Sequence, residues 1–198
     1  MRLITLCLVA GTAFAQVPIE KTPDLEALRA AVKDARAKRP RDAKALLAIK
    51  QGPIEPTLAE DLLKYDWYLA GAWSYPEKKF GVWYDDEELF QFDLNRYLAD
   101  GSELSFSFNI NRLDPAKVQL THVNFTLPPP TTAAIRKVGK QTYFELTAYG
   151  VKELHRVVSY EKGVLILDLS YDGKPNSKTV KFRDARIAMP RLFESSGK

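Results

Sequence analysis

The sequence predicts an all-β fold, an antiparallel up-and-down barrel of about eight strands, preceded by a short helical N-terminal segment. Apolar and polar residues alternate along several stretches after Leu69, most regularly in Ser102–Ile110. About nine such stretches occur before Ile187, and nearly all links between them are short. Short links join antiparallel neighbours, because parallel strands need a long crossover. Such regular up-and-down spacing fits a closed barrel or a sandwich.

The first fifteen residues have the features of a secretory signal peptide. Arg2 gives a positive start, Leu3–Val9 is an apolar run, and Ala13-Phe14-Ala15 has the form at which signal peptidase cleaves. The run is too short to span a bilayer, which needs about 20 residues, and no later stretch approaches that length. We therefore expect a secreted or periplasmic protein that starts at Gln16 and has no transmembrane segment. The alternative is a buried N-terminal strand. The only cysteine, Cys7, lies in the segment expected to be removed, so no disulfide is predicted.

Residues 16–65 form the predicted helical lead-in. Thr22 can cap a helix that has Pro23 at its first position, and an apolar stripe at helical spacing continues to Arg39, which precedes a proline. A second short helix is predicted to end at Gly52-Pro53, and a third to follow Thr57.

The lead-in is rich in basic residues, and the whole chain has a formal net charge of +4. A basic helix can lie on a membrane or on nucleic acid. However, acidic residues are interleaved with the basic ones, and no aromatic residue occurs between Phe14 and Tyr65 to insert or stack. We therefore expect a solvated helix face, with no nucleic acid as a partner.

The β domain is predicted over residues 66–190, with 191–198 as a tail. In Lys117–Leu127 the apolar positions change face between Leu120 and Val123, which suggests a bulge. Tight turns are predicted at Asp100-Gly101 and at Glu161-Lys162-Gly163. The remaining predicted strands are Glu88–Asn95, Ile135–Val138, Gln141–Ala148, Glu153–Tyr160, Val164–Tyr171 and Lys178–Ile187.

A short motif at the start of the β domain carries a family resemblance. The segment Tyr68–Trp73, with Gly71-Ala72-Trp73, follows a short helix and resembles the Gly-x-Trp opening of lipocalin-like proteins of the calycin superfamily. The resemblance implies an eight-stranded barrel in which Trp73 plugs one end beside an arginine of the last strand, Arg183 or Arg186. The family's Thr-Asp-Tyr motif and C-terminal helix are missing, so the chain is closer to the minimal bacterial type. The alternative is that Trp73 is an ordinary core residue.

Side chains that could carry out chemistry are few in the sequence. The two histidines, His122 and His155, lie in separate predicted strands, so each is interpreted as a strand residue with a satisfied hydrogen bond. The acidic run at Asp85–Glu88 is interpreted as a solvated loop, although paired carboxylates can also serve hydrolysis or bind calcium. No phosphate-binding glycine loop occurs. No catalytic residue, metal or cofactor is predicted.

The leading hypothesis is therefore a non-enzymatic exported domain that binds a small apolar or amphipathic molecule, as the resemblance implies. Ligand pockets are mostly apolar, and large apolar strand residues could line one or fill a closed core. One alternative is a structural or protein-interaction module of the cell envelope. Another is an extracellular hydrolase or lyase that uses carboxylates such as Asp85 or Asp86. The candidate ligand-binding residues are Phe92, Phe106, Phe108, Phe144, Leu146 and Leu167.

Overall fold

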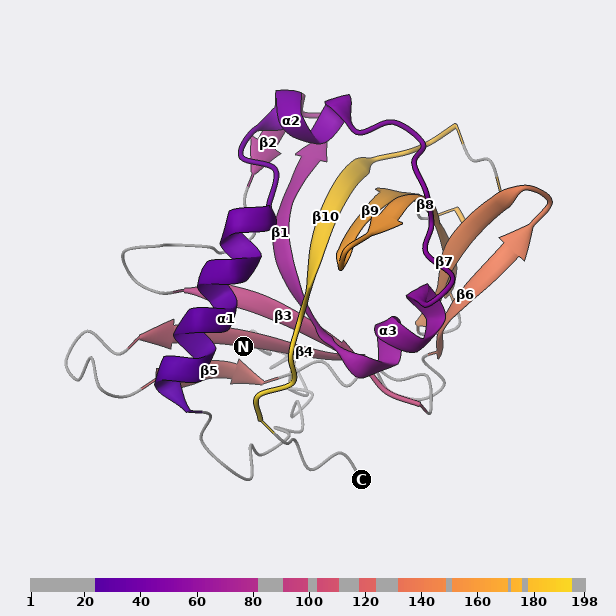
Figure 1. The fold of residues 1–198 in the computed structure, drawn as a ribbon. Helices are drawn as coiled ribbons and strands as arrows, with labels where there is room; N and C mark the ends of the chain where they lie inside the picture. The colour runs from indigo at the N-terminus through magenta and orange to yellow at the C-terminus, as the bar shows by residue number, and fades with distance from the viewer. Residues whose placement is uncertain are drawn as a thin grey trace, which may run out of the picture.

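The computed structural model describes residues 24–81, 91–99, 103–110, 118–123, 132–148, 151–170, 172–175 and 178–193. Within these ranges, three helices and one ten-stranded sheet make up the fold (Figure 1). The predicted signal peptide, residues 1–15, lies outside the described residues, as do Asp85 and Asp86.

Three helices form the lead-in: α1 (Leu25–Lys38), α2 (Ala43–Ala48) and α3 (Leu58–Lys64). The N-cap of α1 is Asp24, whose carboxylate accepts hydrogen bonds from the backbone N–H groups of Glu26 and Ala27. The predicted cap, Thr22, is outside the described residues. The helix ends at Lys38, with Arg39 as its C-cap, as expected from the proline that follows.

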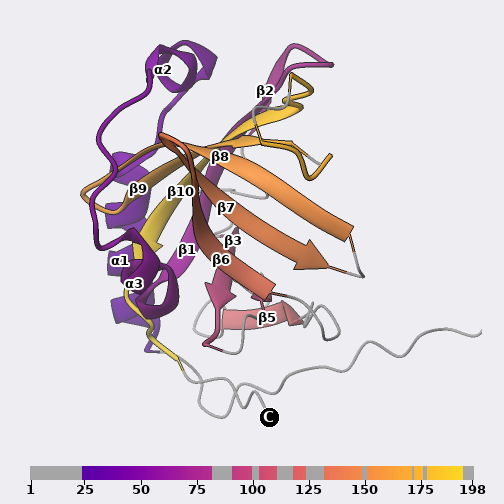
Figure 2. The same ribbon diagram turned by 90° about the vertical axis from the view of Figure 1, so that its right-hand side faces the viewer.

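The strands follow the up-and-down order of one curled antiparallel sheet. The order is β5-β4-β3-β1-β10-β9-β8-β7-β6, with β2 paired to β1, and every pair is antiparallel. The first strand therefore pairs with the last, and the sheet curls into a half-barrel (Figures 1 and 2). This confirms the predicted all-β class with a short N-terminal helical segment. The strands are β1 (Asp66–Ser74), β2 (Lys79–Gly81), β3 (Phe92–Tyr97), β4 (Glu103–Ile110), β5 (Val118–Val123), β6 (Thr132–Val138), β7 (Gln141–Ala148), β8 (Val151–Glu161), β9 (Val164–Leu169) and β10 (Phe182–Met189).

Bulges shape the curl. In β5, Leu120 and His122 pair with the successive residues Phe108 and Ser107, so Thr121 is the extra residue. This confirms the bulge predicted between Leu120 and Val123. A second bulge lies in β1, where the register shifts between Leu69 and Gly71.

Gly71 of the Gly-x-Trp motif is required by close approach at the β1 bulge. Its φ is +155°, and a Cβ there would lie 3.1 Å from Cζ of Phe80 and 3.3 Å from the carbonyl oxygen of Gly81. A side chain at this position would therefore force Phe80 or the β2 backbone to move.

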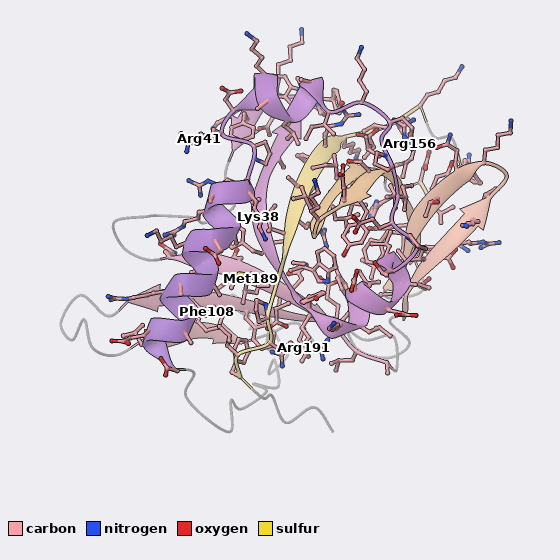
Figure 3. The ribbon with its side chains drawn as sticks, viewed as in Figure 1. Lys38, Arg41, Phe108, Arg156, Met189 and Arg191 are labelled. Carbon is pink, nitrogen blue, oxygen red and sulfur yellow. The ribbon has the colours of Figure 1, made fainter. Side chains whose placement is uncertain are left out.

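Helices cover both the convex face and one end of the half-barrel. On the convex face, α1 and α2 pack over aromatic and aliphatic residues of β1, β3, β4 and β10, and Figure 3 shows Phe108 and Met189 in this layer. At one end, α3 contacts both β3 and β6, which belong to opposite arms of the curl. Its Leu58 and Leu62 pack against Trp67 and Tyr160 on the concave side. The helix therefore closes that end of the half-barrel.

The segment between α2 and α3 adds to the sheet beside β8. The backbone N–H of Gly52 donates to the carbonyl of Val158 (3.0 Å), and the N–H of Tyr160 donates to the carbonyl of Pro53 (2.9 Å). Ile54 forms a parallel bridge with Tyr160. Together with the buried face of α1, these bonds make the lead-in an integral part of the β domain.

Candidate functional site

The concave face of the half-barrel carries a cluster of buried polar side chains. In the β1 ladders, Trp67 is paired with Asn95 of β3, and Leu69 with Arg186 of β10. Since side chains alternate along a strand, Asn95, Arg186 and the neighbouring Asp184 project to the same face as Trp67. We call Asn95, Tyr97, Glu103, Asp184 and Arg186 the interior polar cluster.

Arg186 is the centre of this cluster. Its Nε donates to Oδ2 of Asp184 (2.9 Å), and its Nη1 donates to the hydroxyl oxygen of Tyr97. Its guanidinium also lies 5.9 Å from the centroid of the Phe144 ring. Burial disfavours the charge, but Tyr97, Asp184 and Glu103 raise the pKa of Arg186 above its ordinary value, so it remains a cation.

Aromatic side chains meet across the interior next to this arginine. The rings of Tyr97 and Phe144 are 5.1 Å apart in an edge-to-face arrangement. Tyr97 belongs to β3 and Phe144 to β7, and four strands separate them in the sheet. The contact therefore crosses the half-barrel and joins its two arms.

A second carboxylate, Glu103, is also buried in the cluster. Nδ2 of Asn95 donates to its Oε1 (2.5 Å), and Ser105 Oγ donates to Oδ1 of Asn95 (3.2 Å). Burial raises the pKa of Glu103, and Arg186 and the Asn95 hydrogen bond oppose this rise. The same face of β3 and β4 also holds Asp93, which accepts a hydrogen bond from Ser107 Oγ (2.6 Å).

Asp184 presents an oxygen that no donor of the described residues reaches. The residue is 2% exposed, and its Oδ1 is buried without a hydrogen-bond partner there, whereas Oδ2 is held by Arg186. Its cross-strand neighbours are Ala72 of β1 and Leu167 of β9, both apolar. An unsatisfied buried acceptor costs about 1–3 kcal/mol. The position is therefore suited to a hydrogen-bond donor of a bound molecule with an apolar flank.

His155 lies in β8 opposite Phe144, and both of its ring nitrogens have a polar neighbour. Its Nδ1 accepts from the backbone N–H of Ser170 (3.2 Å), and its Nε2 lies 3.1 Å from Oε2 of Glu153. This confirms the interpretation of His155 as a strand residue with satisfied hydrogen bonds. The side chain of His122 is outside the described part of the structure. In the residues that are described, no three His, Cys, Asp or Glu side chains come together in a way that could hold a metal ion.

The six predicted ligand-binding residues are divided between the two faces of the sheet. Phe92, Phe106 and Phe108 lie on the convex face, in the core that α1 and α2 cover, and the rings of Phe92 and Phe108 stack at 4.8 Å. Phe144 and Leu167 are buried on the concave face, and Leu146 is half-buried beside them in β7. The structure thus brings three of the six to the interior.

The residues predicted to plug the barrel are also divided. Trp73 is paired with Arg183 in the β1–β10 ladder, and it is half-buried at the edge of the convex core. The Arg183 guanidinium donates to both carboxylate oxygens of Asp168 (2.8 and 3.1 Å) and to the Ile49 carbonyl (3.0 Å). Arg186 projects to the opposite face.

The tryptophan that fills the closed end is Trp67. It is fully buried, its Nε1 donates to the Leu62 carbonyl of α3 (3.2 Å), and its ring lies 6.0 Å from that of Tyr160. Sequence reasoning missed Trp67, Glu103 and Asp184. The available signal was the placement of charged residues inside strands of otherwise apolar alternation, as in Arg183-Asp184-Ala185-Arg186.

No family model, curated protein or solved structure matches the chain. Among the helices of the described residues, none is long and apolar enough to cross a membrane.

Proposed function

We propose that this protein is an exported ligand-binding protein whose half-barrel holds a small amphipathic molecule with a hydrogen-bond-donating head. The observation that carries the proposal is the buried, unsatisfied Oδ1 of Asp184 beside the buried Arg186. A ligand donor at this oxygen would remove the cost of leaving a buried acceptor unpaired. The predicted signal peptide supports a secreted or periplasmic location for this activity.

The charge of the interior favours a neutral or cationic head over an anionic one. Among the described residues of the sheet, the carboxyl groups of Asp93, Glu103, Glu153 and Asp184 face the concave side, and the cation in the interior polar cluster is Arg186. Burial raises the pKa of Glu103 and Asp93, and both carboxyl groups can accept hydrogen bonds whether or not they carry a proton. A hydroxyl or ammonium head is therefore the best match.

Apolar residues of β6, β7 and β9 could accommodate the rest of the ligand. Phe144 and Leu167 are buried next to the cluster, whereas Leu146, Ala133 and Ile135 are only partly buried on the same face. Sites for small molecules combine such apolar walls with a few polar groups that fix orientation. This supports an alkyl or other apolar segment along β6 and β7.

A series of fluorescent long-chain probes with equal chain length tests the proposal. The amine and alcohol probes should bind more tightly than the carboxylate at the interior site. Asp184→Asn keeps the size of the side chain but removes its charge, and it should weaken amine binding at least tenfold. The control is Glu60→Gln, which removes a charge from the exposed side of α3 and should change binding less than twofold.

Native mass spectrometry of protein purified from its source would identify the natural ligand. If no probe binds and no small molecule copurifies, the proposal is wrong. If the amine binds equally well to the Asp184→Asn variant, a water satisfies Oδ1 instead of the ligand, and the proposed head site is wrong.

A further inference from the structure

Two grooves lie on the outside of the half-barrel, between the lead-in and the convex face. One, of about 590 Å³, is bounded by α1, by Asp61 and Tyr65 in and just after α3, by the β8–β9 turn and by the end of β10. The other, of about 520 Å³, is bounded by the segment after α2 and by β8 and β9, and we call it the β8–β9 groove. Lys38 and Lys162 line both grooves, so the two adjoin at these lysines. Figure 3 shows Lys38 at the C-terminal end of α1, on the side towards β10.

The β8–β9 groove combines an apolar floor with a basic rim. Ile49, Val164 and Ile166 belong to the convex core or pack against it, and they form the floor. The charged residues of the rim are Lys38, Lys50, Lys162 and Glu161. Glu161 is the only acidic residue among these four, and its Oε1 lies 3.5 Å from Nζ of Lys162. With Lys38 and Lys50, the rim therefore keeps a net positive charge.

Backbone and side-chain bonds fix the walls of this groove. The Arg183 Nη1 donates to the Ile49 carbonyl (3.0 Å), and the Gly52 N–H donates to the Val158 carbonyl (3.0 Å). Lys162 lies in the β8–β9 turn, where its backbone N–H donates to Glu55 Oε1 (3.1 Å). The groove is therefore largely preformed, which lowers the cost of ordering it on binding.

We propose that the β8–β9 groove binds a single-chain anionic amphiphile. Its alkyl chain would lie on Ile49, Val164 and Ile166, and its anionic head would lie between the lysines of the rim. The volume is within the range of small-molecule sites, about 300–1,000 Å³. The adjoining groove is a poorer match for an anion, because Asp34, Glu55 and Asp61 also line it.

This site is separate from the interior polar cluster. It lies on the convex face, and its basic rim favours an anionic head, whereas the interior polar cluster favours a neutral or cationic one. Binding there does not depend on the proposed function, because Asp184 projects to the concave face.

Isothermal titration calorimetry of the mature chain with dodecanoate below its micelle concentration tests the inference. The double variant Lys38→Gln/Lys162→Gln should weaken dodecanoate binding at least tenfold. The matched control, Lys33→Gln/Lys44→Gln, removes the same charge from exposed lysines of α1 and α2 outside the groove and should have an effect below twofold. Because all four side chains are exposed, both variants should fold.

Four outcomes would overturn the inference. Equal weakening in the two double variants would mean that only overall charge matters. Inorganic phosphate that binds as tightly as dodecanoate would mean that the apolar floor contributes nothing. Binding only to vesicles that contain an anionic phospholipid would mean that a bilayer surface, and not a single chain, is recognised. Loss of dodecanoate binding in the Asp184→Asn variant would place the ligand in the interior. Both sites would be supported independently if Asp184→Asn weakens only the binding of the amine and the lysine variant weakens only the binding of dodecanoate.

Discussion

Replacing Arg96 by methionine should destabilise the fold by about 3–5 kcal/mol, because it removes both charged hydrogen bonds of the buried Asp66 carboxylate. The cation that stays near this carboxylate is Arg191, whose Nε lies 3.8 Å from Asp66 Oδ1. Arg96 Nε donates to Asp66 Oδ1 (2.6 Å) and Nη2 to Asp66 Oδ2 (2.8 Å), and the two side chains are only 4% and 1% exposed. Nη2 also donates to the Phe193 carbonyl (3.0 Å), and the guanidinium lies 4.5 Å from the centroid of the Phe193 ring. The substitution therefore also loosens the C-terminal segment from β3.

The pH dependence of this loss separates the charge effect from lost packing. Burial raises the pKa of Asp66 above its ordinary 3.8, and Arg96 opposes the rise. Without Arg96 the folded-state pKa rises further, so the folded variant binds a proton more readily than the unfolded chain does. The variant's stability should then fall as the pH rises above about 3.8, and its difference from the wild type should grow.

Urea unfolding followed by tryptophan fluorescence, between pH 4 and pH 7, measures both effects. The double variant Arg96→Met/Asp66→Asn is the control, because it removes both charges and should lose less than Arg96→Met alone. A loss below about 1 kcal/mol at pH 7, or a loss that does not change with pH, would refute the reasoning.

Three further predictions concern single side chains. Burial raises the pKa of Glu103 above 4.5, so the stability of the wild type relative to Glu103→Gln should fall as the pH rises above that value. The pKa of Asp168 is lowered below 3.8 despite burial, because Arg183 and Arg156 bind its carboxylate. The stability of the wild type relative to Asp168→Asn should therefore fall as the pH drops below 3.8. If urea unfolding gives the same pH dependence of stability loss for the two variants, both predictions are wrong. Trp67→Ala should lower the free energy of unfolding by about 3–5 kcal/mol, and Trp73→Ala should lower it clearly less, because Trp73 is only half-buried. Thermal or urea unfolding measures both losses, and equal losses would exclude Trp67 as the residue that fills the closed end. Gly71→Ala should cost about 1–3 kcal/mol, since its Cβ would crowd the β2 hairpin, and an unchanged unfolding midpoint would argue against that crowding.

The class of fold could be predicted because period-two alternation and short links are local properties of the chain. The predicted bulge near Leu120 followed from the same local signal. The face of each strand could not be predicted in this way. In β3 and β4, Phe92, Phe106 and Phe108 point outwards because α1 covers the convex face, and polar residues such as Asn95 point inwards. Alternation shows which residues share a face, but only packing of the lead-in decides which face is inside.

The candidate site could be predicted only in part for a related reason. Phe144 and Leu167 were candidates because they are large and apolar, and they lie on the concave face. Asp184 and Glu103 were missed because strand charges are usually solvent-exposed, and their burial depends on pairing across β1, β3, β4 and β10. Such pairings join residues that are far apart in sequence, and no local pattern reports them.

The most direct test of the proposed function is a crystal structure of the mature chain with a bound long-chain amine. We expect the amine nitrogen within hydrogen-bond distance of Asp184 Oδ1, about 3 Å, and the alkyl chain against Phe144 and Leu167. An ordered water at Asp184 Oδ1, with the amine elsewhere or absent from the half-barrel, would contradict the proposal.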